Sequence, residues 1–550
     1  MSQPHNAEPH TPHTVNRIVS PSKSEPATPN KRRKRSTAVV VAPRASRRAY
    51  FALIVLVILV FSPLLISDVL WSDFDSIERS AFQSMDSWQQ AWTLDSIRQN
   101  NPIAISSYFL EQTIPLPTAT VHRGINILLH LFAAILLLKN LETLKFPAAF
   151  SATLIFALHP ATIQTLFWAG YRSEIIALIF ILSALYFGSR NRNARDYIVT
   201  IVLTTIACLV HPAAFAIPVI LALVILHQER SIRVESFNRV LPLLCLCLFL
   251  GVWINAGSAH VEGVDPVSTT DRLNHAGQNM AHFTQQALFP IKNALFHRFD
   301  TDANYGISTQ MSLLPFLLFV PFFIFTAYNI RKSWSRAILL GLCSYLVLIV
   351  YGTSQDGHFI NGALAHEDHH LYVALPMIVA LVIVALGSLI YGMGIAGKEL
   401  WVMGYSLLLL VEISLSAAFA YSIAAPTQMW TVMSEQWPNA WEPKAALVDR
   451  IDLSDRSEDS LFTNSQLINI LQDVLEKRPD LVERRKQLAR AFAAEGQRSN
   501  ALREYKRILR ETRPDNEFLE EAARFLDKVG LSWDATKARS RKTQLATPNS

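Results

Sequence analysis

Two neighbouring stretches decide the fold of this chain: HRGINILLHLFAAILL, residues 122–137, and FALHPATIQTLFWAGYRSEIIALIFILSALYF, residues 156–187. Their apolar runs approach the roughly 17–25 mainly apolar residues that a membrane-spanning helix needs. Both stretches also carry ionisable residues, which are costly at membrane depth and mark functional sites by default. The two stretches therefore predict membrane helices that hold a polar site at their ends.

The composition of the whole chain agrees with a membrane protein. Of its 550 residues, 51% are hydrophobic and 17% are charged, whereas soluble domains have about 25% charged residues. The four cysteines lie inside apolar runs, at Cys208, Cys245, Cys247 and Cys343. We expect them to be small core residues, because this arrangement fits neither a disulfide framework nor a zinc knuckle.

The apolar runs predict an all-α polytopic protein with about eleven transmembrane helices. The predicted spans lie near residues 50–70, 121–138, 147–165, 174–189, 196–210, 213–227, 240–256, 312–330, 337–352, 371–394 and 400–423. Together they form a predicted membrane domain at 50–423.

The charge distribution predicts the orientation of the spans. Residues 1–49 hold ten Lys and Arg but only two acidic residues, and they are too poor in large apolar residues to fold. We interpret this segment as a disordered cytoplasmic tail beside the first span, close to anionic lipid. Nucleic-acid binding, another use of basic runs, is not expected.

With the tail inside, the short inner loops carry twelve basic residues, whereas loop 71–120 holds two basic residues against six acids, as the positive-inside rule requires. Loops 71–120 and 257–311 and the C-terminal segment then lie outside. The chain has no Asn-x-Ser/Thr sequence, which favours a bacterial periplasm over an ER lumen. We therefore predict a multi-pass protein of the inner membrane with a periplasmic C-terminal domain.

The polar C-terminal segment predicts helical hairpins. We expect a linker at 424–460, a tetratricopeptide-like helical domain at 461–530 and a disordered tail at 531–550. Residues 481–516 predict two helices that turn near Gly496, with small residues where they cross, as in a tetratricopeptide unit. A plain helical hairpin is the alternative. Either would contact an exported protein or glycan.

Five polar elements converge on the predicted outer face. They are Asp73 and Asp75; His122, Asn126 and His130; His159, Arg172 and Glu174; His297, Arg298 and Asp300; and HEDHHLYVALP at 366–376. His122, Asn126 and His130 are spaced four residues apart, so they share one helix face. A carboxylate can act as general base on an acceptor hydroxyl, while Arg and His stabilise a phosphate leaving group. This arrangement suits glycosyl transfer from a lipid-phosphate donor.

The 122–175 pattern resembles integral-membrane GT-C glycosyltransferases that end in tetratricopeptide repeats, which are similar to protein O-mannosyltransferases. The matching features are His122 and Asn126, followed by His159-Pro160 and then Arg172. DHHLY at 368–372 resembles a family motif before a late span, and ALFPIKNALFHRFD at 287–300 resembles a segment of the second loop.

The resemblance implies an inverting hexosyltransferase that uses a polyprenyl-phosphate sugar and a hydroxyl acceptor. Asp73 would be the catalytic base, with Asp75 as fallback. The residues expected to bind the donor phosphate or sugar are Arg172, His369, His370, Tyr372, Asp368, His122, Asn126, His159 and Arg298. We expect His369 or His370 to lie across one cavity from Arg172. No cofactor is required, and a divalent metal is not expected.

The chain also departs from the family pattern. One acid of the loop-one pair is replaced by Ser72, and a family Arg by Asn101. An inactive GT-C-derived scaffold that recruits periplasmic proteins through its tail is therefore one alternative, and a glycan polymerase or ligase is another. The cluster at 366–370 could also bind a metal or be a solvated loop, and His122 and Asn126 could simply join helices.

Overall fold

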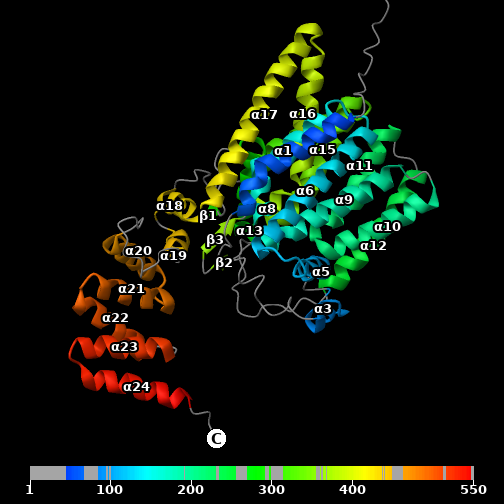
Figure 1. The fold of residues 1–550 in the computed structure, drawn as a ribbon. Coiled ribbons are helices and arrows are strands. Elements are labelled where there is room, and N and C mark those ends of the chain that lie inside the picture. Colours follow the sequence, from blue (N-terminus) through cyan, green and yellow to red (C-terminus); the bar gives the residue numbers. More distant parts are fainter. Residues whose placement is uncertain are drawn as a thin grey trace, which may run out of the picture. The chain divides into compact units, whose positions relative to one another are not determined.

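The computed structural model describes most of the membrane domain and the C-terminal helices (Figure 1). Described are residues 45–66, 85–94, 97, 101–190, 193–230, 234–255, 269–290, 297–298, 314–354, 359–360, 363–366, 368–436, 438, 440–448, 463–511 and 516–546. Most of the predicted basic tail lies outside these residues, as do Asp73 and Asp75.

Every predicted apolar run contains a helix. The spans are formed by α1 (Arg47–Phe61) with η1 (Ser62–Ile66), α6 (Thr118–Thr143), α7 (Ala149–Leu158) with η3 (Pro160–Thr162) and α8 (Ile163–Phe167), α9 (Arg172–Arg190), α10 (Ala194–Val210), η5 (Pro212–Ala216) with α11 (Ile217–Glu229), α12 (Val234–Asn255), α14 (Leu314–Tyr328), α15 (Ser333–Ser354), α16 (Leu375–Tyr391) and α17 (Ile395–Ala424). The predicted all-α polytopic architecture is confirmed.

Length and apolarity separate these helices into two groups. Six are long and apolar enough to cross a membrane by themselves, and α7 with η3 and α8 form a pair bent by 53° at His159-Pro160, which makes a seventh if the pair crosses as one span. Proline bends a helix because its ring removes a backbone donor and clashes with the preceding turn. The remaining apolar helices α10, α12, α14 and α16 are not both long and apolar enough by this measure, and we assign them to the same membrane domain from their packing.

Helix α9 lies inside the bundle. It packs against α6, α10 and α11, and Ile175, Leu178 and Ile181 on it are fully buried. The Asn140 amide of α6 donates to the Leu182 carbonyl of α9 at 2.9 Å. A polar bond of this kind joins helices where lipid supplies no hydrophobic driving force between them. Helix α9 is thereby joined to α6 by a polar bond as well as by apolar packing.

The two large predicted outer loops contain helices of their own. Helices α3 (Met85–Ala91) and α5 (Pro102–Glu111) lie in the first, and α13 (Thr269–Leu288) lies in the second. Helix α5 begins where the sequence favours it: the Asn101 side chain accepts from the Ala104 amide, and proline occupies the first helical position. It packs on α6 and α9, while α13 packs on α15 and on η7 (Asp368–Leu371).

Three short strands join distant parts of the chain. They are β1 (His297–Arg298), β2 (Phe359–Ile360) and β3 (Ala363–His366), in the order β1-β3-β2 with antiparallel pairs. His297 pairs with His366, and Arg298 pairs with Ala365. The backbone of the second loop therefore lies beside the segment that leads into η7.

The C-terminal helices correct two predicted boundaries. The predicted linker at 424–460 contains α18 (Pro426–Gln436) and α19 (Glu442–Val448), and the predicted disordered tail at 531–550 contains α24 (Ser532–Ala546). Helix α24 buries Ala535 and Ala538 against α23 (Asn516–Lys528). Alanine supplies little hydrophobic signal, so the sequence pattern alone did not reveal this face.

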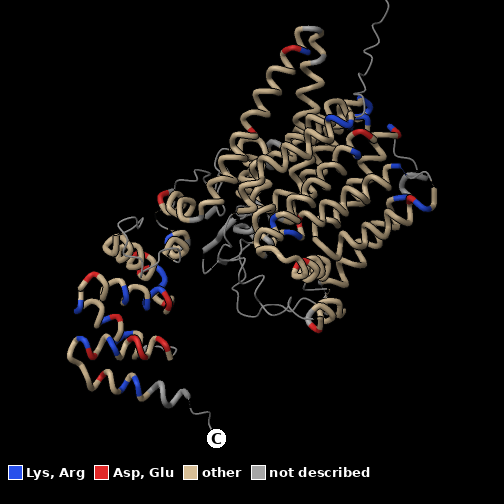
Figure 2. Tube along the Cα trace, viewed as in Figure 1, with Lys and Arg blue, Asp and Glu red and all other residues tan. Residues whose placement is uncertain are grey.

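The remaining tail helices stack as hairpins. They are α20 (Asn464–Lys477), α21 (Val482–Ala494) and α22 (Arg498–Glu511), followed by α23 and α24. Figure 2 shows that charged residues are dense along these helices and sparse within the membrane bundle. The predicted turn near Gly496 is confirmed, since Gly496 has a φ of 77°, a left-handed conformation that favours glycine.

A second turn repeats the first at a fixed spacing. Gly530 also has a positive φ and lies 34 residues after Gly496, which is the tetratricopeptide period. Buried Ala489 and Ala501 recur at the same spacing as buried Ala523 and Ala535. The assignment of these hairpins to the tetratricopeptide class stays a prediction that this spacing supports.

One tyrosine joins the two hairpins. Tyr505 of α22 donates to Glu521 of α23 at 2.6 Å. Burial and the adjacent carboxylate raise the pKa of Tyr505, so its hydroxyl stays protonated and keeps donating.

We predict that Ala501→Leu destabilises the tail. Ala501 is fully buried where α21 and α22 cross, and extra methylenes in a packed core cost about 1–3 kcal/mol. Limited proteolysis of the whole chain should cleave this variant faster within 464–546. Ala494→Leu, at an exposed position of α21, is the matched control; equal cleavage of the two variants would contradict the packing.

Candidate functional site

The first turn of α9 carries two buried ionisable residues. Arg172 is fully buried and Glu174 is 2% exposed. Their side chains enter separate clusters, which we name the Arg172 cluster (Ser107, Glu111, His122, Asn126 and Arg172) and the Glu174 cluster (Tyr171, Glu174, His211, His369 and His370). A buried ion must be paired to be tolerated, so each cluster shows how the chain compensates one charge.

The Arg172 guanidinium is held by four protein groups. Nε donates to Asn126 Oδ1 at 2.7 Å, and one Nη donates to Ser107 Oγ at 2.8 Å. That same Nη forms an ion pair with Glu111, while the other Nη donates to the His122 carbonyl at 3.0 Å. The guanidinium also lies 4.5 Å from the centre of the Tyr108 ring, a favourable cation–π distance.

These contacts give the Arg172 cluster a structural role. The Glu111 carboxylate also contacts His122 Nδ1, so one acid connects α5 to both α6 and α9. The Asn126 amide donates to the Leu166 and Trp168 carbonyls at 3.2 and 3.3 Å. His122 and Asn126 therefore join helices, as the alternative interpretation predicted. Their direct binding of a donor, and that of Arg172, stays a prediction.

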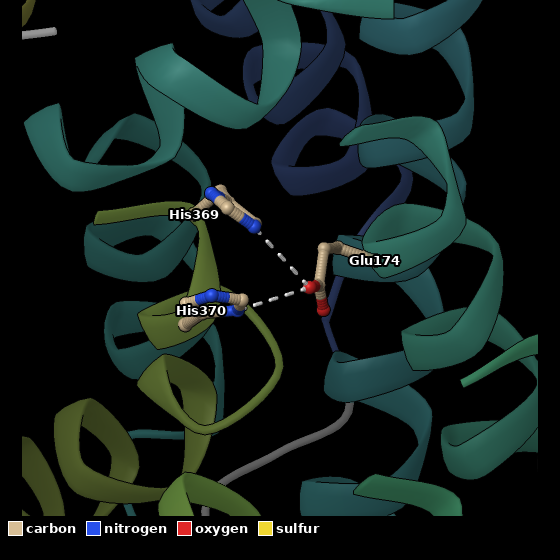
Figure 3. A group of neighbouring side chains, drawn as sticks. All are labelled: Glu174, His369 and His370. Carbon is tan, nitrogen blue, oxygen red and sulfur yellow. Dashed lines mark ion pairs between the residues drawn. The ribbon is translucent and has the colours of Figure 1, made fainter. Parts of the chain in front are cut away.

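The Glu174 cluster joins three elements. Glu174 Oε1 lies 3.0 Å from His211 Nε2, 3.7 Å from His370 Nδ1 and 4.0 Å from His369 Nε2. Figure 3 shows both histidines of η7 facing the carboxylate on α9. The His369 ring stacks on Tyr171, with centroids 3.7 Å apart and planes 8° from parallel. The 369–370 pair thus contacts Glu174, two residues after Arg172 on α9, and the expected position across one cavity from Arg172 stays a prediction.

The two His-Pro sequences form the same local structure. In each, the His Nδ1 accepts a backbone amide two residues later: Ala161 for His159 and Ala213 for His211. The ring proton is then on Nε2. His159 Nε2 is directed to the Ala287 carbonyl of α13 at 3.3 Å, whereas His211 Nε2 is directed to Glu174. Both nitrogens of His159 therefore have protein partners, and its predicted donor contact is untested.

Tyr372 lies in the packed interior of the membrane domain. It is fully buried, and its hydroxyl lies 2.7 Å from His130 Nδ1. His130 Nε2 in turn lies 3.0 Å from the Ala157 carbonyl. Tyr372 therefore joins η7 to α6 and α7, and its predicted contact with the sugar is untested.

The structure does not describe the side chains of four predicted site residues. Asp73 and Asp75 lie outside the described residues, and for Asp368 and Arg298 the structure describes the backbone alone. The β1–β3 pairing nevertheless brings residues 297–298 to the strand that precedes η7. The second loop thus meets β3 at the backbone level, and β3 ends two residues before η7 begins.

Glu111 was not predicted as a site residue from the sequence. It forms ion pairs with both Arg172 and His122. A signal existed: Asn101-Pro102 is a helix-start sequence, and Ser107 and Glu111 are four residues apart on the helix that would follow. Both side chains reach Arg172.

Comparisons with known proteins found a similar sequence and a similar solved structure. No protein-family model matches the chain. Over 268 residues it is 24% identical to protein O-mannosyl-transferase F38B6.6 of Caenorhabditis elegans, covering 46% of this chain and 38% of that protein. Among solved structures, it is similar to arabinofuranosyltransferase AftD from Mycobacteria, with a TM-score of 0.37 and 15% identity, covering 72% of this chain and 29% of that one. The chain thus spans well under half the length of either protein.

We predict that Glu111→Gln strongly destabilises the membrane domain. The change removes the charge that neutralises a fully buried guanidinium, and breaking a buried ion pair costs about 3–5 kcal/mol. Unfolding of the purified chain in detergent measures this loss. Glu229→Gln is the control, because its partner Arg239 is 42% exposed and exposed pairs contribute about 0–1 kcal/mol.

The double variant Glu111→Leu/Arg172→Met separates pairing from packing. Apolar replacement of a whole buried ion pair is often neutral, so we expect it to recover most of the lost stability. A double variant less stable than Glu111→Gln would contradict pairing as the main role.

Proposed function

We propose that this chain is a membrane glycosyltransferase that moves a sugar from a polyprenyl-phosphate donor to a hydroxyl acceptor. The observation that carries the proposal is the sequence similarity to a protein O-mannosyl-transferase. The buried Arg172 and Glu174 clusters support it, because ionisable groups within membrane helices are rarely retained without a function.

In the proposed reaction, Asp73 takes the proton of the acceptor hydroxyl while that oxygen attacks the anomeric carbon. The bond between this carbon and the donor phosphate oxygen breaks, and the anomeric configuration inverts. Polyprenyl phosphate leaves with the bonding electron pair. His369 and His370 stabilise the phosphate charge, since cationic or donor groups fixed where charge develops lower the barrier.

Arg172 acts in this proposal chiefly as a positioning residue. Its contacts tie α5 to α6 and α9, and α5 follows the segment that carries Asp73. Glu174 lies two residues further along and faces the His369 and His370 pair. One rigid helical turn would therefore align the acceptor side of the reaction with the donor side.

The acceptor is a hydroxyl group, such as Ser or Thr of an exported protein, and the tail hairpins would hold it. Stacked helical hairpins present extended surfaces for peptides. The proposed orientation places the tail in the periplasm and residues 1–49 in the cytoplasm, following the positive-inside rule.

A reporter experiment tests this orientation. Alkaline phosphatase is active only after export, so a fusion after Ser550 should be active, and one within 191–192, in a predicted inner loop, should be inactive. The reverse pattern would contradict the proposed face of the reaction.

We predict that Asp73→Asn reduces transfer by about 10²-fold or more, the lower range of a general base. The assay is mass spectrometry of exported proteins from cells that express each variant at equal level. Asp75→Asn is the matched control and should retain transfer. Loss with Asp75→Asn alone would move the base to Asp75. Loss with neither variant would favour the non-enzymatic scaffold.

A further inference from the structure

The Glu174 cluster contains a group of side chains with the geometry of a metal site. One carboxylate oxygen of Glu174 and one ring nitrogen each of His369 and His370 lie within 4.8 Å of one another (Figure 3). The ligands come from α9 and η7, about 200 residues apart in the chain. The possible site within 366–370 that the sequence suggested lacks this carboxylate, which changes its chemistry.

The buried negative charge of Glu174 must be compensated by a positive charge nearby. Among the described residues, its ion-pair contacts are with histidines alone, and its Oε2 has no hydrogen-bond partner there. A carboxylate that is 2% exposed needs nearby positive charge. Histidines supply that charge only when they are protonated, whereas a divalent ion bound between Glu174, His369 and His370 supplies it with neutral imidazoles.

The surroundings also hold the ligands in place. The Nε2 proton of His211 points to Glu174 Oε1 at 3.0 Å, because its Nδ1 accepts from the Ala213 amide. Ligating carboxylates are usually oriented by such an outer hydrogen bond. Tyr171 stacks on His369 and limits the rotation of that ring. The hydrogen bond from His211 and the stacking of Tyr171 therefore preorganise the site, and neither residue is itself a ligand.

We propose that Glu174, His369 and His370 bind a zinc ion, with His211 as the group that orients the carboxylate. Imidazole nitrogens favour zinc over magnesium or calcium, which take oxygen ligands. Two histidines and one glutamate are a three-ligand set that leaves a fourth position open. With zinc bonds of about 2.0–2.2 Å, ligand atoms lie roughly 3.3 Å apart. The observed 3.7 and 4.0 Å therefore require small side-chain rotations.

The open position would accept an oxygen ligand. If the proposed function holds, this ligand is an oxygen of the donor phosphate, and zinc neutralises its charge in place of direct contact with the histidines. Zinc binding itself does not depend on that function, so the two claims fail separately.

The test is zinc binding by the purified full-length chain. The chain carries an affinity tag without histidine, is stripped with a chelator in detergent, and is titrated with zinc against a chromophoric competitor. We expect about one zinc ion per chain. Glu174→Gln, His369→Ala and His370→Ala should each lower the affinity by more than the 10- to 100-fold loss expected for the outer variant His211→Gln.

His227→Ala is the matched control. His227 is a half-buried histidine of α11, in ring contact with Phe146, outside the Glu174 cluster. It should bind zinc as the unchanged chain does. Zinc should also raise the thermal midpoint of the unchanged chain and of His227→Ala, with no rise for His370→Ala, which separates lost binding from lost folding.

An unchanged chain that binds zinc no more tightly than His370→Ala would overturn the proposal, as would a zinc-induced midpoint rise of equal size in the two. Normal zinc binding together with absent glycosyl transfer would refute the proposed function and leave the zinc site standing.

Discussion

The structure of the site depends on the burial of two opposite charges, Arg172 and Glu174, within one turn of α9. Neither side chain reaches water, so each must be compensated by groups from other elements. Arg172 is neutralised by Glu111 of α5, and Glu174 faces His211, which caps η5, and the two histidines of η7. Compensation of the two buried charges therefore brings α5 and η7 to the first turn of α9. We propose that the reaction occurs there.

The separation of the two clusters assigns different roles to residues that look alike in sequence. His122, Asn126 and Arg172 use their polar groups on one another or on helix backbones. His369 and His370 instead face a carboxylate. The Arg172 and Glu174 clusters thus meet at the first turn of α9, which supplies one charged residue to each.

Much of the fold could be predicted from the sequence, because long apolar runs are local signals. Each predicted span contains a helix, and the turn at Gly496 lies where small residues indicated it. The polar contacts were less predictable, since residues such as Glu111 and His122 meet only through tertiary packing. The sequence contains two His-Pro pairs, at His159 and His211. It could not show that one is directed to a carbonyl and the other to Glu174. Helix α24 was missed because its buried face is alanine.

The central claim is that the start of α9 and η7 form the donor-phosphate site. The most direct measurement is a cryo-electron microscopy map of the full chain in lipid nanodiscs with a non-transferable polyprenyl-phosphate sugar analogue. The account predicts phosphate density beside His369 and His370, within one residue layer of Glu174, with Arg172 still paired to Glu111. Phosphate density on another face of the helix bundle, with the Glu174 cluster unchanged, would contradict it.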